Sequence, residues 1–228
     1  MFKITWLGQA GLLFEDKDKD LTIMIDPYLS NSVIKVNPNN YRRVLIDEKF
    51  FDIRPDVMIF THDHLDHLDY ETAERFLENE EKSIIVMASA QGYQNIVGKK
   101  HGHNYLRMIP GTEWTEKGVR FTAITAVHSE PTAIGIIIDD GEKKYYITGD
   151  TLYNEKIFAE LPQDIDVLFL PINGVGNNMN VTDARRFADK VGAKVTVPMH
   201  VGMFDENSPE MFDYSSMVVP KLYEEMDL

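Results

Sequence analysis

The chain has 228 residues, 43% of them hydrophobic and 26% charged, a composition that suits a globular protein with a sizeable core and excludes a disordered chain. Its net charge of −14 at pH 7 disfavours nucleic acid and anionic membranes as partners. Because the chain contains no cysteine, it cannot form disulfides, thiolate metal ligands or a cysteine nucleophile.

The first half of the chain alternates predicted strands and helices. Residues 2–7, 12–15 and 21–25 are predicted strands joined by tight turns, because their apolar residues alternate or run together between turn residues. Residues 30–51 have a weaker pattern and are predicted to form a long loop with a short helix. The pattern then predicts a buried strand at 56–60, a helix at 71–79, a strand at 84–87, a helix at 89–97 and a polar loop at 98–104.

The second half has a similar pattern. Residues 119–127 are a predicted strand, and residues 133–138 and 144–147 flank Asp140 and Gly141, a strong hairpin signal. Further along, the pattern predicts a helix at 154–161, a strand at 166–170, a helix at 182–191 closed by Gly192, a strand at 194–198 and a final helix at 215–225.

No linker separates the two halves, so we expect a single domain spanning residues 1–228. Two sheets packed face to face with helices outside would fit this order of elements, and so would a doubly wound sheet. Periodicity alone does not choose between them.

The expected location follows from the N-terminal residues and the lengths of the apolar runs. The opening MFKITWLGQAG has no basic segment followed by a long apolar stretch, so we expect no signal peptide. No apolar run approaches the length needed to span a bilayer. We therefore expect a cytoplasmic protein without a membrane partner.

The segment THDHLDHLD contains three of the seven histidines. Its motif H-x-H-x-D-H comprises His62, His64, Asp66 and His67, on a predicted loop between a buried strand and a helix. Alternate residues of an extended segment point the same way, and imidazole binds zinc, manganese and iron alike. One ion could bind His62 and His64, and a second could bind Asp66 and His67. The alternative is a surface turn that happens to be rich in histidine. Three histidines and an aspartate within six residues are, however, improbable by chance.

Three further candidate ligands follow predicted strands. His128 follows the strand at 119–127, Asp150 follows the strand at 144–147, and His200 follows the strand at 194–198. Functional sites gather where several strands end at one edge of a sheet. Taken singly, each histidine would be a surface or hydrogen-bonded core residue and Asp150 a turn or helix cap, but their shared placement favours ligands.

In this order, the motif and the three later residues resemble the metallo-β-lactamase superfamily. The segments ITWLGQAGLLFE, IDPYLS, NGVGNNMNVTDA and AKVTVPMHVGMF resemble its L-ascorbate-6-phosphate lactonase-like branch. The resemblance covers residues 3–204 and implies an α/β fold, a four-layer αββα sandwich with the site at one edge. The implied ligands are His62, His64 and His128 for a first metal, Asp66, His67 and His200 for a second, and Asp150 as a bridge.

The resemblance also implies the chemistry. Two divalent ions, zinc or manganese and alternatively iron, would be the cofactors, since ligation by nitrogen and oxygen accepts all three. A hydroxide bridging the ions would be the nucleophile, and Asp66 and Asp150 would be catalytic residues that help to orient it.

Other polar residues near these motifs have two interpretations. Asp26, in IDP, resembles a residue that orients a metal-binding histidine, or it is a turn residue before Pro27. Three asparagines after the strand at 166–170 either face the substrate or supply turn chemistry, namely Asn173, Asn177 and Asn178.

Four more residues receive simpler interpretations. Gln9 and Gly11 are expected to serve only the opening turn. His101 and His103 match no motif and are expected to be exposed loop residues.

Three functions are compatible with the sequence. The first is a hydrolase of a small polar metabolite, for which the branch resemblance suggests a sugar-phosphate lactone. The chain is shorter than lactonases of the ascorbate pathway, so their substrate cannot be carried over. The second is a phosphodiesterase acting on a small nucleotide or a phospholipid-like ester. The third, a non-catalytic metal-binding scaffold, is disfavoured because no ligand is missing.

Related enzymes often assemble, so a homo-oligomer is an open alternative to a monomer.

Overall fold

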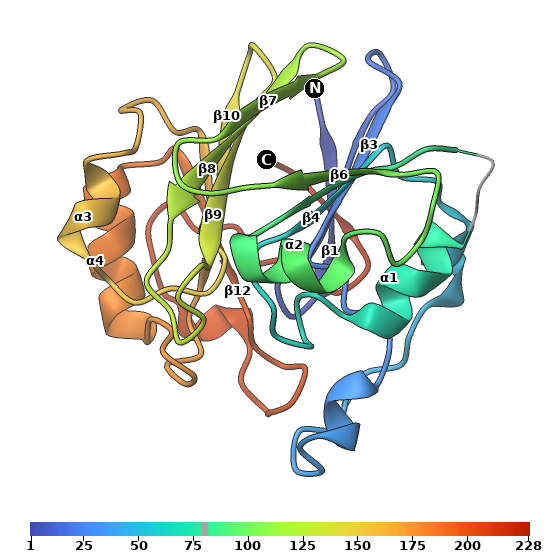
Figure 1. Ribbon diagram of the computed structural model, residues 1–228. Coiled ribbons are helices and arrows are strands. Elements are labelled where there is room, and N and C mark those ends of the chain that lie inside the picture. Colours follow the sequence, from blue (N-terminus) through green and yellow to red (C-terminus); the bar gives the residue numbers. More distant parts are fainter. Residues whose placement is uncertain (79–81) are drawn as a thin grey trace.

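A computed structural model describes residues 1–78 and 82–228 of the chain. Two β-sheets pack face to face, and helices cover the outer face of each sheet (Figure 1). The predicted αββα sandwich is therefore confirmed, and the alternative of one doubly wound sheet is excluded.

The first sheet combines an antiparallel meander with a parallel half. Its strand order is β13-β1-β2-β3-β4-β5-β6. Pairing is antiparallel from β13 to β3 and parallel from β3 to β6, so the parallel strands require long crossovers. The strands are β1 (Lys3–Gly8), β2 (Gly11–Asp16), β3 (Leu21–Ile25), β4 (Val57–Phe60), β5 (Ile85–Ala88), β6 (Asn104–Arg107) and β13 (Glu225–Met226).

The second sheet is built in the same way. Its order is β12-β11-β10-β9-β8-β7, antiparallel from β7 to β10 and parallel from β10 to β12. The strands are β7 (Glu113–Glu116), β8 (Val119–Thr125), β9 (Ile134–Asp139), β10 (Lys144–Ile147), β11 (Val167–Pro171) and β12 (Val195–Met199).

Helices occupy the crossovers of both sheets. In Figure 1, α1 (Tyr70–Leu77) and α2 (Ala90–Ile96) lie on the outer side of the first sheet, and α3 (Glu155–Phe158) and α4 (Val181–Val191) on that of the second. Short 3-10 helices occur at η1 (Ser32–Lys35), η2 (Glu48–Asp52) and η3 (Pro209–Met211). Among the described residues, no helix is long and apolar enough to cross a membrane.

The alternation of buried side chains explains the four layers. On β4, Val57 and Ile59 face the core between the two sheets, whereas Met58 and Phe60 pack beneath α1 and α2. All four side chains are buried. Successive residues of a strand point to opposite faces, so an entirely apolar strand fits a sheet that is covered on both sides.

The predicted helix at 215–225 is wrong. Pro220 lacks the N–H that a helix interior needs, and this segment instead runs beside the sandwich. The amide of Val218 donates to the carbonyl of Thr196, and the amide of Tyr223 donates to the carbonyl of Trp6. The segment therefore leads into β13, which pairs with β1 as an edge strand of the first sheet.

The other differences from the predicted elements are smaller. The edge strands β6 and β7 were not predicted, because both are short and mostly half-exposed or exposed. The helix predicted at 154–161 shortens to α3. The helix predicted at 71–79 is α1, and its last predicted residue lies outside the described residues.

Candidate metal centre

The structure brings the seven predicted ligands together at one edge of the sandwich. They come from loops that follow β4, β8, β10 and β12. Their ligand atoms form three groups that could each hold an ion: His62 with His64 and His128; His62 with His67 and Asp150; and Asp66 with His67 and His200. The first and third groups are the two sets that the resemblance implied.

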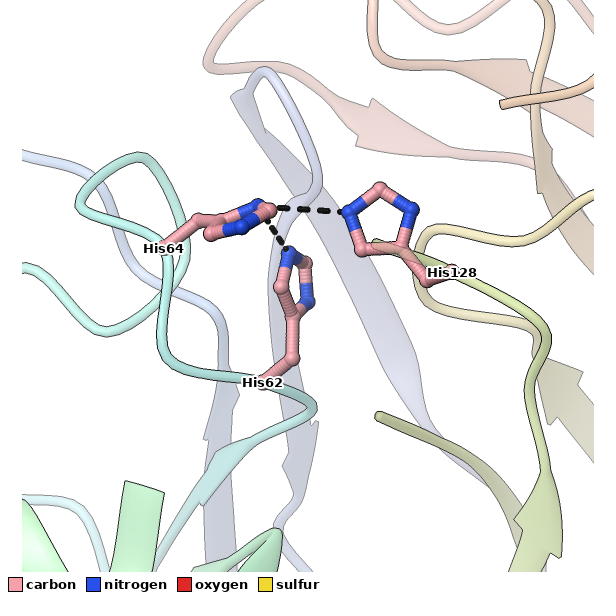
Figure 2. Close-up of side chains that lie close together, drawn as sticks. All are labelled: His62, His64 and His128. Atoms are coloured by element: carbon pink, nitrogen blue, oxygen red, sulfur yellow. Dashed lines mark hydrogen bonds between the residues drawn. The ribbon is translucent and has the colours of Figure 1, made fainter. Parts of the chain in front are cut away.

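Three imidazole rings converge in the first group (Figure 2). Nδ1 of His64 lies 3.0 Å from Nε2 of His62 and 3.2 Å from Nε2 of His128. Bonds of about 2.1 Å around a tetrahedral zinc ion place ligand nitrogens about 3.4 Å apart, so the observed spacing is close to that of a metal site.

Partners on the far side of two rings direct their free nitrogens toward this centre. Nδ1 of His128 lies 3.2 Å from the backbone carbonyl of Asn177, which can only accept a hydrogen. Nδ1 of His62 lies 3.1 Å from the Thr61 hydroxyl, which itself donates to Asp26 at 2.6 Å and so accepts from His62. Both neutral rings therefore present an Nε2 lone pair, as a metal requires.

The loop that carries the histidines is fastened to the two helices of the first sheet. The amides of His67 and Leu68 donate to the carbonyl of His64 at 2.9 and 2.8 Å, which closes a turn. The carboxylate of the half-buried Asp63 accepts from Tyr70 on α1 and Asn95 on α2, each at 2.5 Å. These contacts fix the loop conformation that aims His62 and His64 at one point.

The second group consists of two imidazoles and a carboxylate. Nε2 of His67 lies 3.1 Å from Nε2 of His200, and the nearest oxygen of Asp66 lies 3.4 Å from His200 and 3.9 Å from His67. His67 and His200 are both buried. The set offers the nitrogen and oxygen donors that zinc, manganese and iron accept.

Asp26 lies directly behind His67. It is fully buried at the end of β3, and its Oδ2 accepts from Nδ1 of His67 at 2.8 Å. Its Oδ1 accepts from the amide of Thr61 at 2.8 Å. Of the two interpretations left open by the sequence, the contacts favour a residue that orients a histidine and directs its Nε2 toward the centre.

Asp150 lies between the two groups. Its Oδ1 is 3.3 Å from Nε2 of His67, and its Oδ2 is 3.1 Å from Nε2 of His200 and 3.8 Å from Nε2 of His128. Asn178 donates to Oδ2 at 2.8 Å, whereas Oδ1 is buried without a hydrogen-bond partner among the described residues. A buried carboxylate oxygen of this kind needs a partner, and a cation between the groups would supply it.

Gln9 is a site residue that the sequence interpretation missed. Its side-chain amide donates to Asp66 at 2.8 Å and lies 3.2 Å from the ring of His200. The amide of Asn173 lies 2.9 Å from Nδ1 of His200. Gln9 lies between β1 and β2, so the rule that predicted the ligands, a polar residue at a strand end, would have selected it as well.

Asn177 and His103 have structural roles, whereas His101 is an exposed loop residue. Asn177 supplies turn chemistry, because it adopts a left-handed φ of 64° and contributes its backbone carbonyl. His101 is exposed, as predicted. His103 lies on the loop before β6, as predicted, but it is half-buried and not exposed: its ring accepts from the amide of Ile84 at 3.2 Å and bonds the carbonyl of Leu77 at 2.9 Å.

Electrostatics divides the histidines into two kinds. Burial lowers the pKa of His62 well below its usual value, and the neighbouring His67 lowers it further. Burial also lowers the pKa of His128. Both rings are therefore neutral near pH 7, the form that binds a metal ion.

The second group behaves in the opposite way. Burial lowers the pKa of His200, but the carboxylates of Asp150 and Asp66 outweigh it and raise that pKa to about 9. The pKa of His67 is raised well above its usual value for the same reason. Without a metal, protons balance these buried carboxylates, and a divalent cation held by the same atoms would replace them. The donor set and its charge therefore fit a metal ion.

Three residues of the centre have strained backbone conformations. Gln9, Asp26 and His200 adopt left-handed φ values of 53°, 43° and 64°. Such conformations are costly for residues other than glycine and tend to persist at functional sites. The amide of His200 donates to the carbonyl of Gln9 at 3.0 Å, so these two strained residues also support each other.

A cavity of about 550 Å³ opens onto the centre. Its wall includes His64, Asp66, His128, Asp150 and His200, so both groups of candidate ligands reach it. Volumes of this order are typical of sites for small molecules.

Sequence comparisons relate the chain to known proteins. A family model described as "Beta-lactamase superfamily domain" matches residues 22–201. A UPF0173 protein of Pyrococcus furiosus is 30% identical over 218 residues, which cover 92% of this chain and 88% of that protein. A UPF0173 metal-dependent hydrolase of Thermoplasma acidophilum is 29% identical over 221 residues, with the same two coverages of 92% and 88%.

A solved structure shares the fold over nearly its whole length. A metallo hydrolase from the archaeon Ignicoccus hospitalis matches with a TM-score of 0.77 at 21% identity, covering 98% of this chain and 97% of that protein. At this identity the likeness shows the fold alone, whereas the family model and the Pyrococcus relative show common membership. The chain belongs to the UPF0173 metal-dependent hydrolase family of the metallo-β-lactamase superfamily.

Proposed function

We propose that the chain is a hydrolase that uses two divalent metal ions to cleave a small polar metabolite. One observation carries this proposal: two groups of three ligand atoms lie on either side of Asp150, and both open into one cavity. His62, His64 and His128 would hold the first ion. Asp66, His67 and His200 would hold the second, with Asp150 between them.

The side chains around the centre would prepare it for hydrolysis. Bound divalent ions supply Lewis acidity toward a carbonyl or phosphoryl oxygen and lower the pKa of water toward neutrality. Asp66 and Asp150 would orient the attacking water through their carboxylate oxygens. Gln9 and Asn178, which donate to those carboxylates at 2.8 Å, would keep them in place.

A lactone is the substrate class that we propose. The segments that resemble the L-ascorbate-6-phosphate lactonase-like branch contain Gln9, Asp26, Asn173, Asn178 and His200. In the structure each of these residues bonds a candidate ligand or is one. The branch resemblance thus lies in the machinery of the site, which supports related chemistry. No specific observation favours the phosphodiesterase alternative, and the complete ligand set disfavours a non-catalytic scaffold.

The test combines metal content with turnover. Protein purified without added metal should carry about two ions per chain, zinc, manganese or iron, and should hydrolyse lactones until it is treated with a chelator. His200→Ala should lose an ion and most turnover, whereas His101→Ala, which alters an exposed residue, should retain both. Matching circular dichroism spectra would show that both variants fold. Two bound ions without turnover of any lactone or phosphodiester would contradict the proposed activity.

A single domain and a cytoplasmic location stay predictions, and a homo-oligomer stays an open alternative to a monomer. Light scattering of the purified protein decides the last of these, since a mass of about 26.2 kDa would mean a monomer.

A further inference from the structure

The wall of the cavity beyond the candidate ligands is partly apolar. Val33, Val175 and Phe204 contribute hydrocarbon surface to it, and Asn40 and Ser129 contribute neutral polar groups. Val33 is buried, and Val175 is 63% exposed at the rim. The cavity therefore offers a surface for the uncharged part of a ligand.

No lysine or arginine lines the cavity in the described part of the chain, although the sequence contains 23 of them. The nearby cations have other partners. Arg42 donates to the carbonyl of Tyr28 at 2.5 Å and to the hydroxyl of Tyr223 at 2.6 Å. Arg43 donates to the carbonyl of Phe204 at 3.0 Å and pairs with Glu206 at 3.3 Å.

The charged groups of the wall are carboxylates. Asp66, Asp150 and Asp205 line the cavity. Two divalent ions would add four positive charges opposite these three carboxylates. All four positive charges would lie at the reacting end of the cavity. A phosphate dianion elsewhere on a substrate would meet no lysine or arginine in this wall, which instead contains the carboxylate of Asp205. Burying an unpaired charge is costly, so such a substrate is disfavoured.

We infer that the substrate is an uncharged ester, most simply a neutral lactone, whose uncharged part lies against the wall that contains Val33, Val175 and Phe204. This inference rests on the proposed function and narrows it, because it removes the phosphate from the sugar-phosphate lactone suggested by the branch resemblance. Water adds its oxygen to the carbonyl carbon, the acyl C–O bond breaks, and the leaving alkoxide takes a proton from the water. The product is a hydroxycarboxylic acid, which releases its acid proton to the solvent and leaves as a carboxylate anion bearing one new hydroxyl.

Turnover of a matched pair of substrates tests the charge preference. Glucono-δ-lactone and phosphogluconolactone share the reacting ring and differ by one phosphate. We expect kcat/KM to be at least about ten-fold higher for the neutral lactone, because the wall offers the phosphate no counter-charge. A higher kcat/KM for the phosphorylated lactone would overturn the inference and leave the hydrolase function intact.

A new cation at the rim should shift this preference. Val175→Lys would place an ammonium group in the wall, and a partly exposed ion pair changes the ratio of the two kcat/KM values by roughly two- to five-fold in favour of phosphogluconolactone. Val36→Lys is the matched control, because Val36 is 69% exposed and does not line the cavity. An unchanged ratio in Val175→Lys would contradict the placement of substrate against this wall.

Equilibrium binding provides a readout that does not depend on turnover. With metal-loaded protein, calorimetry compares inorganic phosphate with glucitol phosphate, a sugar phosphate that has no lactone carbonyl. We expect the two Kd values to agree within about three-fold, because the only cations available to a phosphate would be the metal ions. Glucitol phosphate binding more than about ten-fold tighter would reveal a sugar-phosphate pocket and overturn the inference. If neither lactone is hydrolysed, the proposed lactonase function fails, and this comparison still decides the charge preference.

Discussion

Replacing Asp26 by Asn tests whether a residue behind the candidate ligands controls metal affinity. Asn keeps the shape of Asp and tolerates the left-handed φ of 43° at this position better than most residues. The carboxylate accepts three hydrogen bonds, from the amide and hydroxyl of Thr61 at 2.8 and 2.6 Å and from His67 at 2.8 Å. In Asp26→Asn, the amide NH2 must face at least one of these buried donors.

The magnitude follows from these contacts. A buried donor without an acceptor costs about 1–3 kcal/mol, so the metal-free protein should lose stability of that order. Loss of a carboxylate behind a metal-binding histidine lowers metal affinity by about 10–100-fold, which corresponds to about 1.4–2.7 kcal/mol. We therefore expect the ion held by His67 to be bound more weakly in Asp26→Asn.

The assay is a zinc titration against a competing chelator, run beside urea unfolding of the metal-free protein. Asp16→Asn is a matched control, because Asp16 is a buried carboxylate at the far end of β2 that accepts from the amides of Asp18 and Lys19. It should lose stability and keep wild-type metal affinity. Equal metal affinity in both variants would refute the reasoning and return Asp26 to the role of a turn residue before Pro27.

Three other outcomes are expected. Gly149→Ala should destabilise the protein by about 1–3 kcal/mol in urea unfolding and lower its metal content. The reason is that φ at Gly149 is 59° and an added Cβ would lie 2.7 Å from the carbonyl oxygen of Ile134. Wild-type stability of this variant would contradict the expectation. The raised pKa of His200, about 9, stabilises the metal-free protein fully below pH 6.5, and this contribution is lost as the pH rises through 9. Zinc must displace that proton, so calorimetry in two buffers of different ionisation enthalpy should detect proton release at pH 7, and none would argue against ligation by His200. Asn178→Ala removes the 2.8 Å bond to Asp150 and should weaken metal binding about ten-fold in the chelator competition, with unchanged affinity as the opposing result.

Much of the fold could be predicted because the strands bury different cores on their two faces. On β11, Val167 and Phe169 pack between the sheets, whereas Leu168 and Leu170 pack beneath α4. A strand buried on both faces forms a continuous apolar run, which stands out in the sequence. The edge strand β7 has the sequence EWTE, pairs with only one other strand, β8, and is mostly exposed. Its residues therefore show no apolar pattern that would indicate a strand. The segment at 215–225 was mistaken for a helix because its apolar residues have helical spacing, although Pro220 disrupts it.

The candidate ligands were predictable for a different reason. Their residue types are unusual, and each directly follows a strand or lies on the loop after it. The surrounding contacts were not predictable, because they depend on backbone conformations that residue type does not indicate. Gln9 could have been selected as a polar residue at a strand end, but residue type does not indicate its hydrogen bond to Asp66. Asn177 acts through its carbonyl and not its side chain.

Anomalous diffraction from crystals of the zinc-loaded protein, recorded on both sides of the zinc absorption edge, tests the central claim most directly. The account predicts two peaks on either side of Asp150, one among His62, His64 and His128 and the other among Asp66, His67 and His200. A single peak, or peaks elsewhere, would contradict a dinuclear centre built from these residues.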